Sequence, residues 1–184
     1  MAKHVCPWWF GYLMASPLRR LTDDPAKILT PHVRAGMTVL EPGPGMGFFT
    51  LELARLVGPS GRVVAVDVQP RMIEGLKRRA ARAGLLDRVE ARLAAPDSLG
   101  VGDLAGAVDF VLAYGVVHEV PAAGPFFIEV SQTLKPGASL LLAEPKSRVN
   151  VVEFEGELQA AGRAGLQVRG RLSMGRMRAA LLQK

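Results

Sequence analysis

Short apolar stretches alternate along this chain with longer stretches in which apolar residues recur every three or four positions. The first pattern predicts buried β-strands, and the second predicts helices with one apolar face. Strands are expected at about 37–41, 62–67, 88–93, 107–113 and 139–144, with two more around Gly175. Helices are expected from Pro25 and at about 47–57, 70–83, 121–134 and 151–164. Strands that alternate with helices in this way indicate an α/β fold built on a largely parallel sheet.

The stretch from Met37 to Asp67 carries the most chemical information. Its first strand ends in Glu41, a turn with glycines at 43, 45 and 47 follows, and its second strand ends in Asp67. Glycines allow a tight turn with outward-pointing N–H groups, and these donors favour an anionic group beside the following helix N-terminus. A carboxylate placed like Asp67 can accept both hydroxyls of a ribose. We therefore predict a nucleotide-type pocket at the carboxyl edge of these strands.

A dinucleotide-binding glycine turn is the competing interpretation of this stretch. That pattern requires its third glycine at position 48, where this chain has Phe48, and the third glycine here is Gly47. Glu41 also stands two residues before the first glycine. A dinucleotide-dependent oxidoreductase is therefore a distant alternative.

Two segments resemble the class I S-adenosylmethionine-dependent methyltransferases. EPGPGMG is similar to the first motif of that family, with VVAVD as its second-strand acid, and LKPGASLLLAEP (Leu134 to Pro145) is similar to its helix–turn–strand around strand five. The resemblance covers about residues 25–184. It implies a three-layer, doubly wound α/β fold with seven strands in the order 3-2-1-4-5-7-6, strand 7 antiparallel. It also implies S-adenosyl-L-methionine as cofactor and S-adenosyl-L-homocysteine as product.

The resemblance assigns roles to residues of the first half. The turn that contains Gly43, Pro44, Gly45 and Gly47 would hold the methionine part of the cofactor. Glu41 would orient the turn and the cofactor's amino end, although a strand-end acid that only caps the turn is the alternative. Asp67 would bind the ribose, with Val68 against the adenine and Met72 in both the core and the adenine wall.

The third strand is followed by LAAPDSL, which departs from the family's habit of an acid soon after the strand. Ala95 would offer only backbone and a small apolar surface to the cofactor. Asp97 either reaches the adenine amino group or caps the next helix together with Ser98, and the sequence leaves both open.

The fourth strand ends in Tyr114, and His118 and Glu119 follow. At the carboxyl edge of a central strand these residues are expected to face the cofactor's methyl group. Tyr114 is counted among the cofactor-binding residues. His118 is the candidate general base, because imidazole takes up a proton near neutral pH, and Glu119 is a candidate to orient it. The alternative is that His118 only holds the loop in place.

Composition narrows the partners. The net charge is +6 and the pI is about 10, but the charges are dispersed, which favours a solvated surface. No aromatic residues stand among the densest basic residues, so a nucleic-acid partner is left open but not favoured. Those residues are Arg163, Arg169, Arg171, Arg176 and Arg178. The single cysteine, Cys6, permits no internal disulfide and suits the cytoplasm.

Residues 1–22 form a distinct segment, aromatic first and basic after, ahead of a single predicted domain at 23–184. We expect the segment to be a lid over the cofactor, with packing on the sheet edge or a dimer contact as the alternative. Pro7, two tryptophans and Arg19–Arg20 argue against a signal peptide, and no apolar run is long enough to span a membrane. His4 and Cys6 alone make a weak metal site, so no metal is predicted.

These observations favour a methyltransferase for a small-molecule acceptor. The segment YGVVHEVP after strand four lacks the motif of amino-group methylation and looks like the quinone-type branch. Arsenic methylation in that group relies on several cysteines, which this chain lacks. An RNA or protein methyltransferase and a non-catalytic cofactor-binding partner subunit are the alternatives. Either a monomer or a homodimer is compatible with the sequence.

Overall fold

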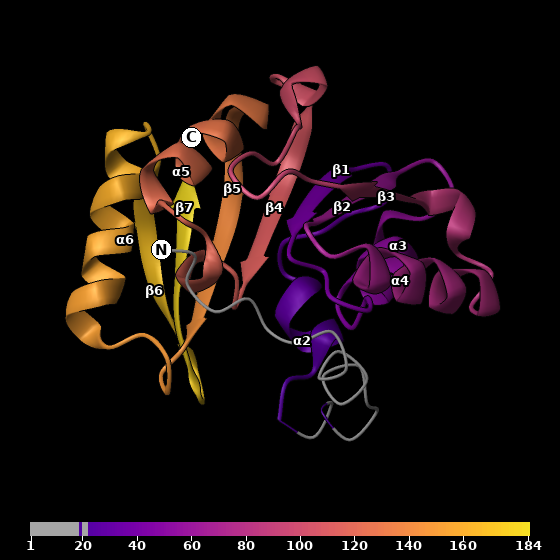
Figure 1. Ribbon diagram of the computed structural model, residues 1–184, viewed down its shortest axis with the longest axis horizontal. Coiled ribbons are helices and arrows are strands. Elements are labelled where there is room, and N and C mark those ends of the chain that lie inside the picture. Colours follow the sequence, from indigo (N-terminus) through magenta and orange to yellow (C-terminus); the bar gives the residue numbers. More distant parts are fainter. Residues whose placement is uncertain (1–18, 20–21) are drawn as a thin grey trace. The chain divides into compact units, whose positions relative to one another are not determined.

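The computed structural model describes residue 19 and residues 22–184 (Figure 1). Seven strands form a sheet in the order β3-β2-β1-β4-β5-β7-β6. β7 runs antiparallel to both of its neighbours, so the predicted fold class and strand order are confirmed. Apart from Arg19 and Thr22, the predicted lid at 1–22 lies outside the described residues, and so do His4 and Cys6. The lid and the predicted domain limits therefore stay predictions.

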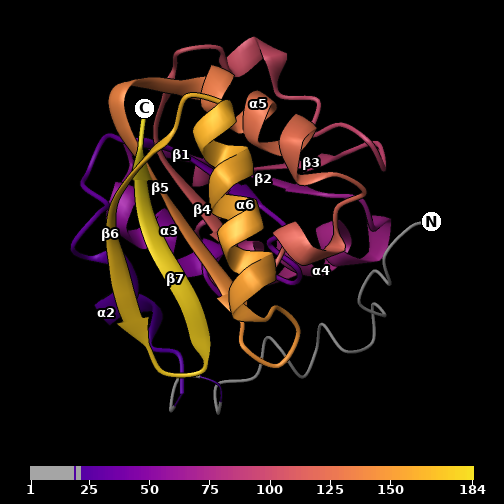
Figure 2. The same cartoon turned by 90° about the vertical axis from the view of Figure 1, so that its left-hand side faces the viewer.

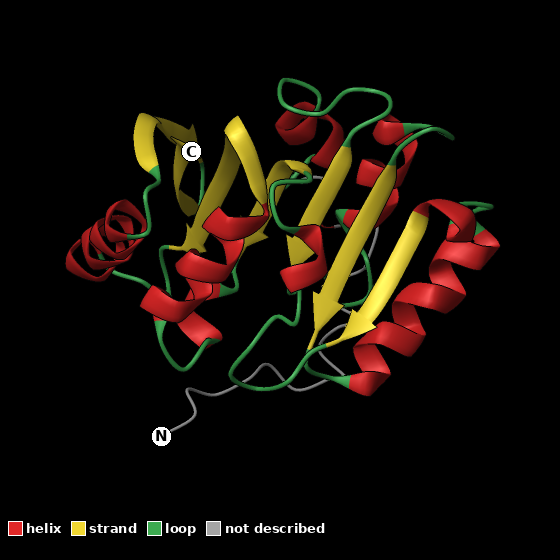
Figure 3. Ribbon diagram, turned by 90° about the horizontal axis from the view of Figure 1, so that it is seen from above, coloured by secondary structure: helices red, strands yellow, loops and turns green. Residues whose placement is uncertain are grey.

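The described chain divides into two compact units, residues 19–94 and residues 95–184. Helices flank the strands of each unit (Figure 3). The first unit contains α2 (Pro25–Leu29), β1 (Thr38–Pro42), α3 (Thr50–Val57), β2 (Arg62–Asp67), α4 (Pro70–Arg82) and β3 (Val89–Leu93). The second contains β4 (Val108–Tyr114), α5 (Ala123–Thr133), β5 (Leu134–Pro145), α6 (Val151–Arg163), β6 (Gln167–Met174) and β7 (Met177–Gln183).

The pattern of apolar residues explains how the strands and helices of the first unit pack. β1, β2 and β3 pair in parallel, and β2 is buried from Val63 to Asp67, as expected of a strand covered on both faces. α4 begins with Pro70 at its first turn, where a missing N–H costs nothing. Its buried residues recur at helical spacing, which packs one stripe of the helix against β2 and β3. They are Met72, Ile73, Gly75, Leu76 and Ala80.

The second unit has β4 and β5 parallel and a hairpin of β6 and β7 (Figure 2). Leu140 to Ala143 in β5 are fully buried. Phe110 and Phe127 are among the largest buried side chains of the second unit. α5 packs against α6. α6 begins with a capping box, in which Asn150 and Glu153 each accept a hydrogen bond from the other's backbone N–H.

Three local predictions are wrong. The helix after the glycine turn begins at Thr50 rather than 47, because Gly47 has a φ of +83°, which no α-helix tolerates. β5 begins at Leu134 rather than 139, because Leu134 already pairs with Val108. No α-helix follows Asp97 for it to cap.

Ser98 bonds elsewhere, which explains why no cap forms there. Its hydroxyl donates to Glu129 in α5, and Glu129 also accepts from the N–H of Leu99. The segment is therefore held by a distant helix, and the Ser98 hydroxyl also accepts a local hydrogen bond from the N–H of Gly100.

Candidate functional site

The glycine turn follows β1 directly. Gly43, Gly45 and Gly47 all have positive φ, between +54° and +83°, which favours glycine. The N–H of Gly43 donates to Val66 and the N–H of Gly47 donates to Pro44, so both groups hold the turn together. A Cβ on Gly47 would lie 2.4 Å from Leu76 Cδ1, whereas a Cβ on Gly45 would meet nothing within 4 Å. The turn thus has no room for a side chain at Gly47 but has open space at Gly45.

Glu41 is buried at the end of β1. Its carboxylate accepts a 2.6 Å hydrogen bond from the Thr50 hydroxyl at the start of α3. Burial raises the pKa of Glu41 to about 7, and the charge of Asp67 adds to the rise. The hydrogen bond from Thr50 and the charge of Arg19 act in the opposite direction. Glu41 is therefore a buried acid that is ready to release its proton near neutral pH.

Asp67 is buried at the end of β2, one strand away from Glu41. Its Oδ1 accepts a 2.9 Å hydrogen bond from the N–H of Gln69, which fixes the side chain at the entry to α4. The next residue, Val68, is 39% exposed, and Met72 is buried. A buried acid that is followed directly by an exposed apolar side chain suits a polar sugar beside an apolar ring.

Leu93 is an additional residue that the sequence analysis missed. It pairs with Asp67 in the register of β2 and β3 and is 58% exposed, so it offers apolar surface beside the end of β2. The sequence signal was an apolar residue directly at the predicted end of the third strand.

These residues fit the predicted cofactor. Glu41 and Asp67 are two buried acids whose charges repel one another, and a bound ammonium group would relieve that repulsion. The exposed apolar surface of Val68 and Leu93 lies beside Asp67 in sequence and in register, where an adenine would follow a ribose. The two acceptor side chains and the apolar surface therefore fit an amino group, a ribose and a base.

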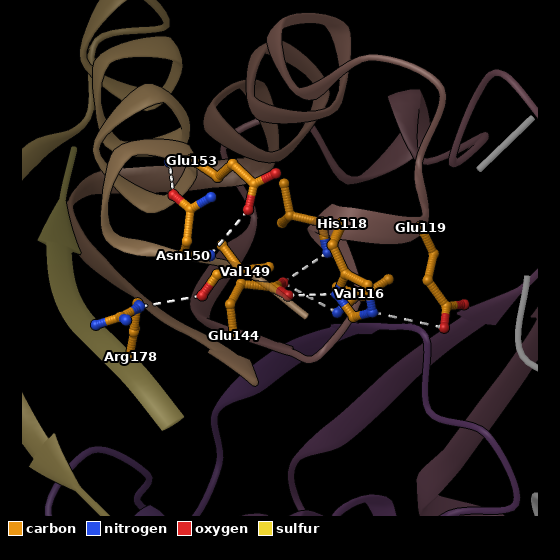
Figure 4. A network of polar contacts seen from close by, with 9 residues as sticks. Val116, His118, Glu119, Glu144, Val149, Asn150, Glu153 and Arg178 are labelled. Carbon is orange, nitrogen blue, oxygen red and sulfur yellow. Dashed lines mark hydrogen bonds and ion pairs between the residues drawn. The ribbon is translucent and has the colours of Figure 1, made fainter. Parts of the chain in front are cut away.

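The second unit contains its own polar network, centred on Glu144 (Figure 4). Glu144 lies in β5 and is completely buried. Its Oε1 accepts hydrogen bonds from the N–H groups of Val116 and Val117, at 3.1 and 2.7 Å. Its Oε2 contacts Nδ1 of His118. The loop after β4 is therefore tied to β5 through this one carboxylate.

The charge around His118 is negative. Burial alone lowers the pKa of His118, but the hydrogen bond and charge of Glu144, followed by the charges of Glu119 and Glu157, outweigh it and raise the pKa. Nε2 of His118 lies 3.8 Å from Glu119 Oε1, beyond hydrogen-bond distance. Glu144, and not the predicted Glu119, is thus the direct partner. Its signal in the sequence was an acid at the end of the fifth strand.

The structure divides the predicted site residues between the two units. Glu41, the glycine turn, Asp67, Val68 and Met72 belong to the first unit. Ala95, Tyr114 and His118 belong to the second. Tyr114 ends β4 and pairs with Ala143, and Ala95 forms an isolated bridge with Ser98.

Two kinds of feature are absent from the described residues. No group of three or more histidine, cysteine, aspartate and glutamate side chains is arranged to hold a metal ion in the described part of the chain. None of the helices at 22–184 is both long and apolar enough to cross a bilayer.

Comparison with known proteins identifies the family. A methyltransferase domain family matches residues 34–169, which is well over half of the chain. The chain belongs to this methyltransferase family. The resemblance to class I S-adenosylmethionine-dependent methyltransferases is thereby confirmed, and the predicted enzyme class and cofactor are those of this family.

Two curated relatives are methyltransferases. Arsenite methyltransferase of Halobacterium salinarum is 33% identical over 109 residues, which cover 59% of this chain and 27% of the relative. The ubiquinone/menaquinone biosynthesis C-methyltransferase UbiE of Hahella chejuensis is 32% identical over 121 residues, which cover 65% and 47%. The chain thus spans less than half the length of these relatives.

The fold also matches solved structures. A SAM dependent methyltransferase from Aquifex aeolicus superposes with a TM-score of 0.86 at 24% identity, over 97% of this chain and 98% of that one. At this identity the match supports the fold, and it extends over nearly the full length of both chains.

Proposed function

We propose that this protein transfers a methyl group from S-adenosylmethionine to a small-molecule acceptor. The observation that carries the proposal is the pair of buried acids, Glu41 and Asp67, on either side of a glycine turn within the family-matching region. When bound, the cofactor supplies an electrophilic methyl group on a positively charged sulfur.

Each residue of the first unit has a proposed role. Glu41 accepts hydrogen bonds from the cofactor's ammonium group, and its buried charge becomes favourable when that cation is present. Asp67 accepts the ribose hydroxyls. Val68, Met72 and Leu93 provide the apolar wall for the adenine, and the open space at Gly45 leaves room for the methionine chain.

From the second unit we propose Ala95 and Tyr114 as further cofactor-binding residues, and His118 on the acceptor side. Ala95 offers a small surface to the adenine, and Tyr114 ends the fourth strand at its carboxyl edge. His118 contacts the acceptor as a general base, which agrees with its negatively charged surroundings.

Two observations favour a small acceptor, and a third argues against arsenite among small acceptors. UbiE is named as a C-methyltransferase of quinone biosynthesis, and catechol O-methyltransferase of Mycobacterium tuberculosis is 50% identical over 52 residues. A single cysteine, Cys6, argues against arsenite. Among the clustered arginines, Arg171 pairs with Glu155, Arg169 with Gln183 and Arg178 with the carbonyl of Val149. These internal contacts weaken the case for a nucleic-acid partner.

Calorimetric titration with S-adenosylmethionine and S-adenosylhomocysteine tests the cofactor site. The wild type is expected to bind both, and Asp67→Asn to weaken binding by about 2 kcal/mol, on the scale of hydrogen bonds to a charged group. Glu74→Gln, at an exposed acid of α4, is the matched control. Binding of NADH in place of both compounds would overturn the assignment.

Turnover tests the acceptor class. We expect formation of S-adenosylhomocysteine with catechol or with 1,4-naphthoquinol, and not with transfer RNA or a protein mixture. Cofactor binding without turnover on all of them would favour the non-catalytic partner subunit. Sedimentation would distinguish the monomer from the homodimer, and we expect the protein to work in the cytoplasm, since a single cysteine suits a reducing compartment.

A further inference from the structure

We propose that Glu144 is a positioning residue that holds His118 as a base with Nε2 available, and that the methyl acceptor is one that must lose a proton. This inference rests on the proposed function and deepens it. It assigns a role to a side chain of β5 and restricts the acceptor to a group that gives up a proton, such as a hydroxyl, a thiol or an activated carbon.

The geometry of Glu144 leaves the side chain little freedom. It is fully buried, and its Oε1 receives two backbone N–H donors from the loop that also carries His118 (Figure 4). Both oxygens of a carboxylate are acceptors, so Oε1 takes the two N–H donors and Oε2 is left to accept from His118.

The contact between Glu144 and His118 therefore determines the tautomer. Since Oε2 accepts, Nδ1 of His118 carries the proton, and Nε2 has the free electron pair in the neutral ring. The nearest acid to Nε2, Glu119, lies 3.8 Å away and does not occupy it with a hydrogen bond.

Acids from three elements surround the imidazole. Glu144 comes from β5, Glu119 from the 3-10 turn Val117–Glu119, and Glu157 from α6. Their negative charge outweighs the effect of burial and raises the pKa of His118. The protonated ring that forms during the reaction is thus stabilised in place.

Protons and electrons balance when the methyl group passes to an acceptor X–H. The electron pair of X forms the bond to the methyl carbon while the methyl–sulfur bond breaks toward sulfur, and the proton of X passes to Nε2. One positive charge disappears at sulfur and one appears on the imidazole, where the acids stabilise it. A thioether acceptor has no such proton and would gain nothing from this arrangement.

Nitrogen-15 NMR of the imidazole rings tests the arrangement directly, with His118→Gln to assign the signal. In the wild type we expect the proton on Nδ1 and a pKa above the ordinary value of 6.5. Glu144→Gln keeps an oxygen for the two N–H donors but presents an amide N–H₂ to Nδ1. We expect it to move the proton to Nε2 and to lower the pKa by at least about one pH unit.

Glu119→Gln is the matched control and is expected to keep the proton on Nδ1. Should Glu144→Gln fail to fold, the wild-type spectrum alone still decides, because a proton on Nε2 or a pKa below 6.5 overturns the proposal. Calorimetry keeps this test separate from the proposed function, since Glu144→Gln and Glu119→Gln are both expected to bind S-adenosylmethionine like the wild type.

The acceptor class is tested with catechol against dimethyl sulfide. His118→Gln is expected to lose about 100-fold or more in kcat with catechol, the usual contribution of a general base. Glu144→Gln is expected to lower kcat and to shift its pH profile, with little change in KM. Full catechol turnover by His118→Gln, or wild-type turnover with dimethyl sulfide alone, overturns the inference.

Discussion

Arg79 in α4 donates a hydrogen bond from Nη1 to the carbonyl oxygen of Met46, at 2.5 Å. Met46 is the residue between the second and third glycines of the turn, and its side chain packs close to Gly75, where an added Cβ would lie 2.9 Å from Met46 Cγ. Gly75 and Arg79 are one helical turn apart, so one face of α4 holds the glycine turn by packing and by a hydrogen bond.

Arg79→Met should therefore loosen the turn. We expect a loss of about 1.5–3 kcal/mol of stability, typical of a hydrogen bond to a charged group, and a several-fold weaker affinity for S-adenosylmethionine. Urea unfolding and calorimetry would measure the two effects. The neighbouring Arg78→Met, which removes a half-exposed arginine 3.9 Å from Glu74, is the control and should change neither by much.

Two glycines of the turn should differ in their tolerance. Gly47→Ala places a methyl group against the buried Leu76 at a φ of +83°, and we expect it to cost about 2–4 kcal/mol in unfolding free energy. Gly45→Ala has only the backbone cost, about 1–2 kcal/mol, because nothing lies within 4 Å. Equal losses in urea unfolding would contradict this structure of the turn.

Glu41 should make stability depend on pH. Because folding raises its pKa from 4.5 to about 7, the folded state binds a proton that the unfolded state has lost. The contribution of Glu41 to folding stability is therefore fully present below pH 4.5 and is lost as pH rises through 7. The side chain of Glu41→Gln stays neutral, so the free energy of unfolding of this variant should exceed that of the wild type by roughly 3 kcal/mol at pH 8 and by almost nothing at pH 4.

The same substitution should weaken cofactor binding, because a neutral amide cannot pair with an ammonium group. Urea unfolding at pH 4 and pH 8, together with calorimetry, would reveal the opposite signs. A variant that is less stable than the wild type at pH 8 would show that the burial of Glu41 carries no such cost.

The capping box of α6 offers a fourth test. The N–H of Glu153 donates to Asn150 Oδ1 at 3.0 Å, and the N–H of Asn150 donates to Glu153 Oε2 at 2.8 Å. Asn150→Ala should cost about 1 kcal/mol in unfolding free energy. Asn150→Asp keeps the acceptor and should restore most of it, and a loss as large as that of alanine would argue against the cap.

The sequence predicted those parts of the fold that local pattern determines. The strand–turn–helix–strand from Met37 to Asp67 needs only neighbouring residues, and β2 was predicted with its observed limits, 62–67. Helix limits were less accurate where one backbone angle decided them. Gly47 is an example, because nothing in the residue type tells whether its φ is positive.

Glu144 shows why the remaining contacts could not be predicted from local sequence pattern. Its partners, Val116, Val117 and His118, lie 26 to 28 residues earlier in the chain, and only the pairing of β4 with β5 brings them together. Glu119, next to His118 in sequence, was the natural choice but lies too far from Nε2. Similarly, Ser98 bonds to Glu129, 31 residues away, and not to a local helix.

The position of β6 at the end of the strand order has a consequence for behaviour at high concentration. A sheet edge exposes unpaired backbone groups that invite strands of other molecules, and proteins prevent this with irregularities and charges. β6 has both, since its register shifts between Val168 and Gly170 and the exposed Arg169 and Arg171 stand on either side of Gly170. Arg169 and Arg171 thus stand on an edge strand, where charged side chains oppose edge-to-edge pairing with neighbouring copies.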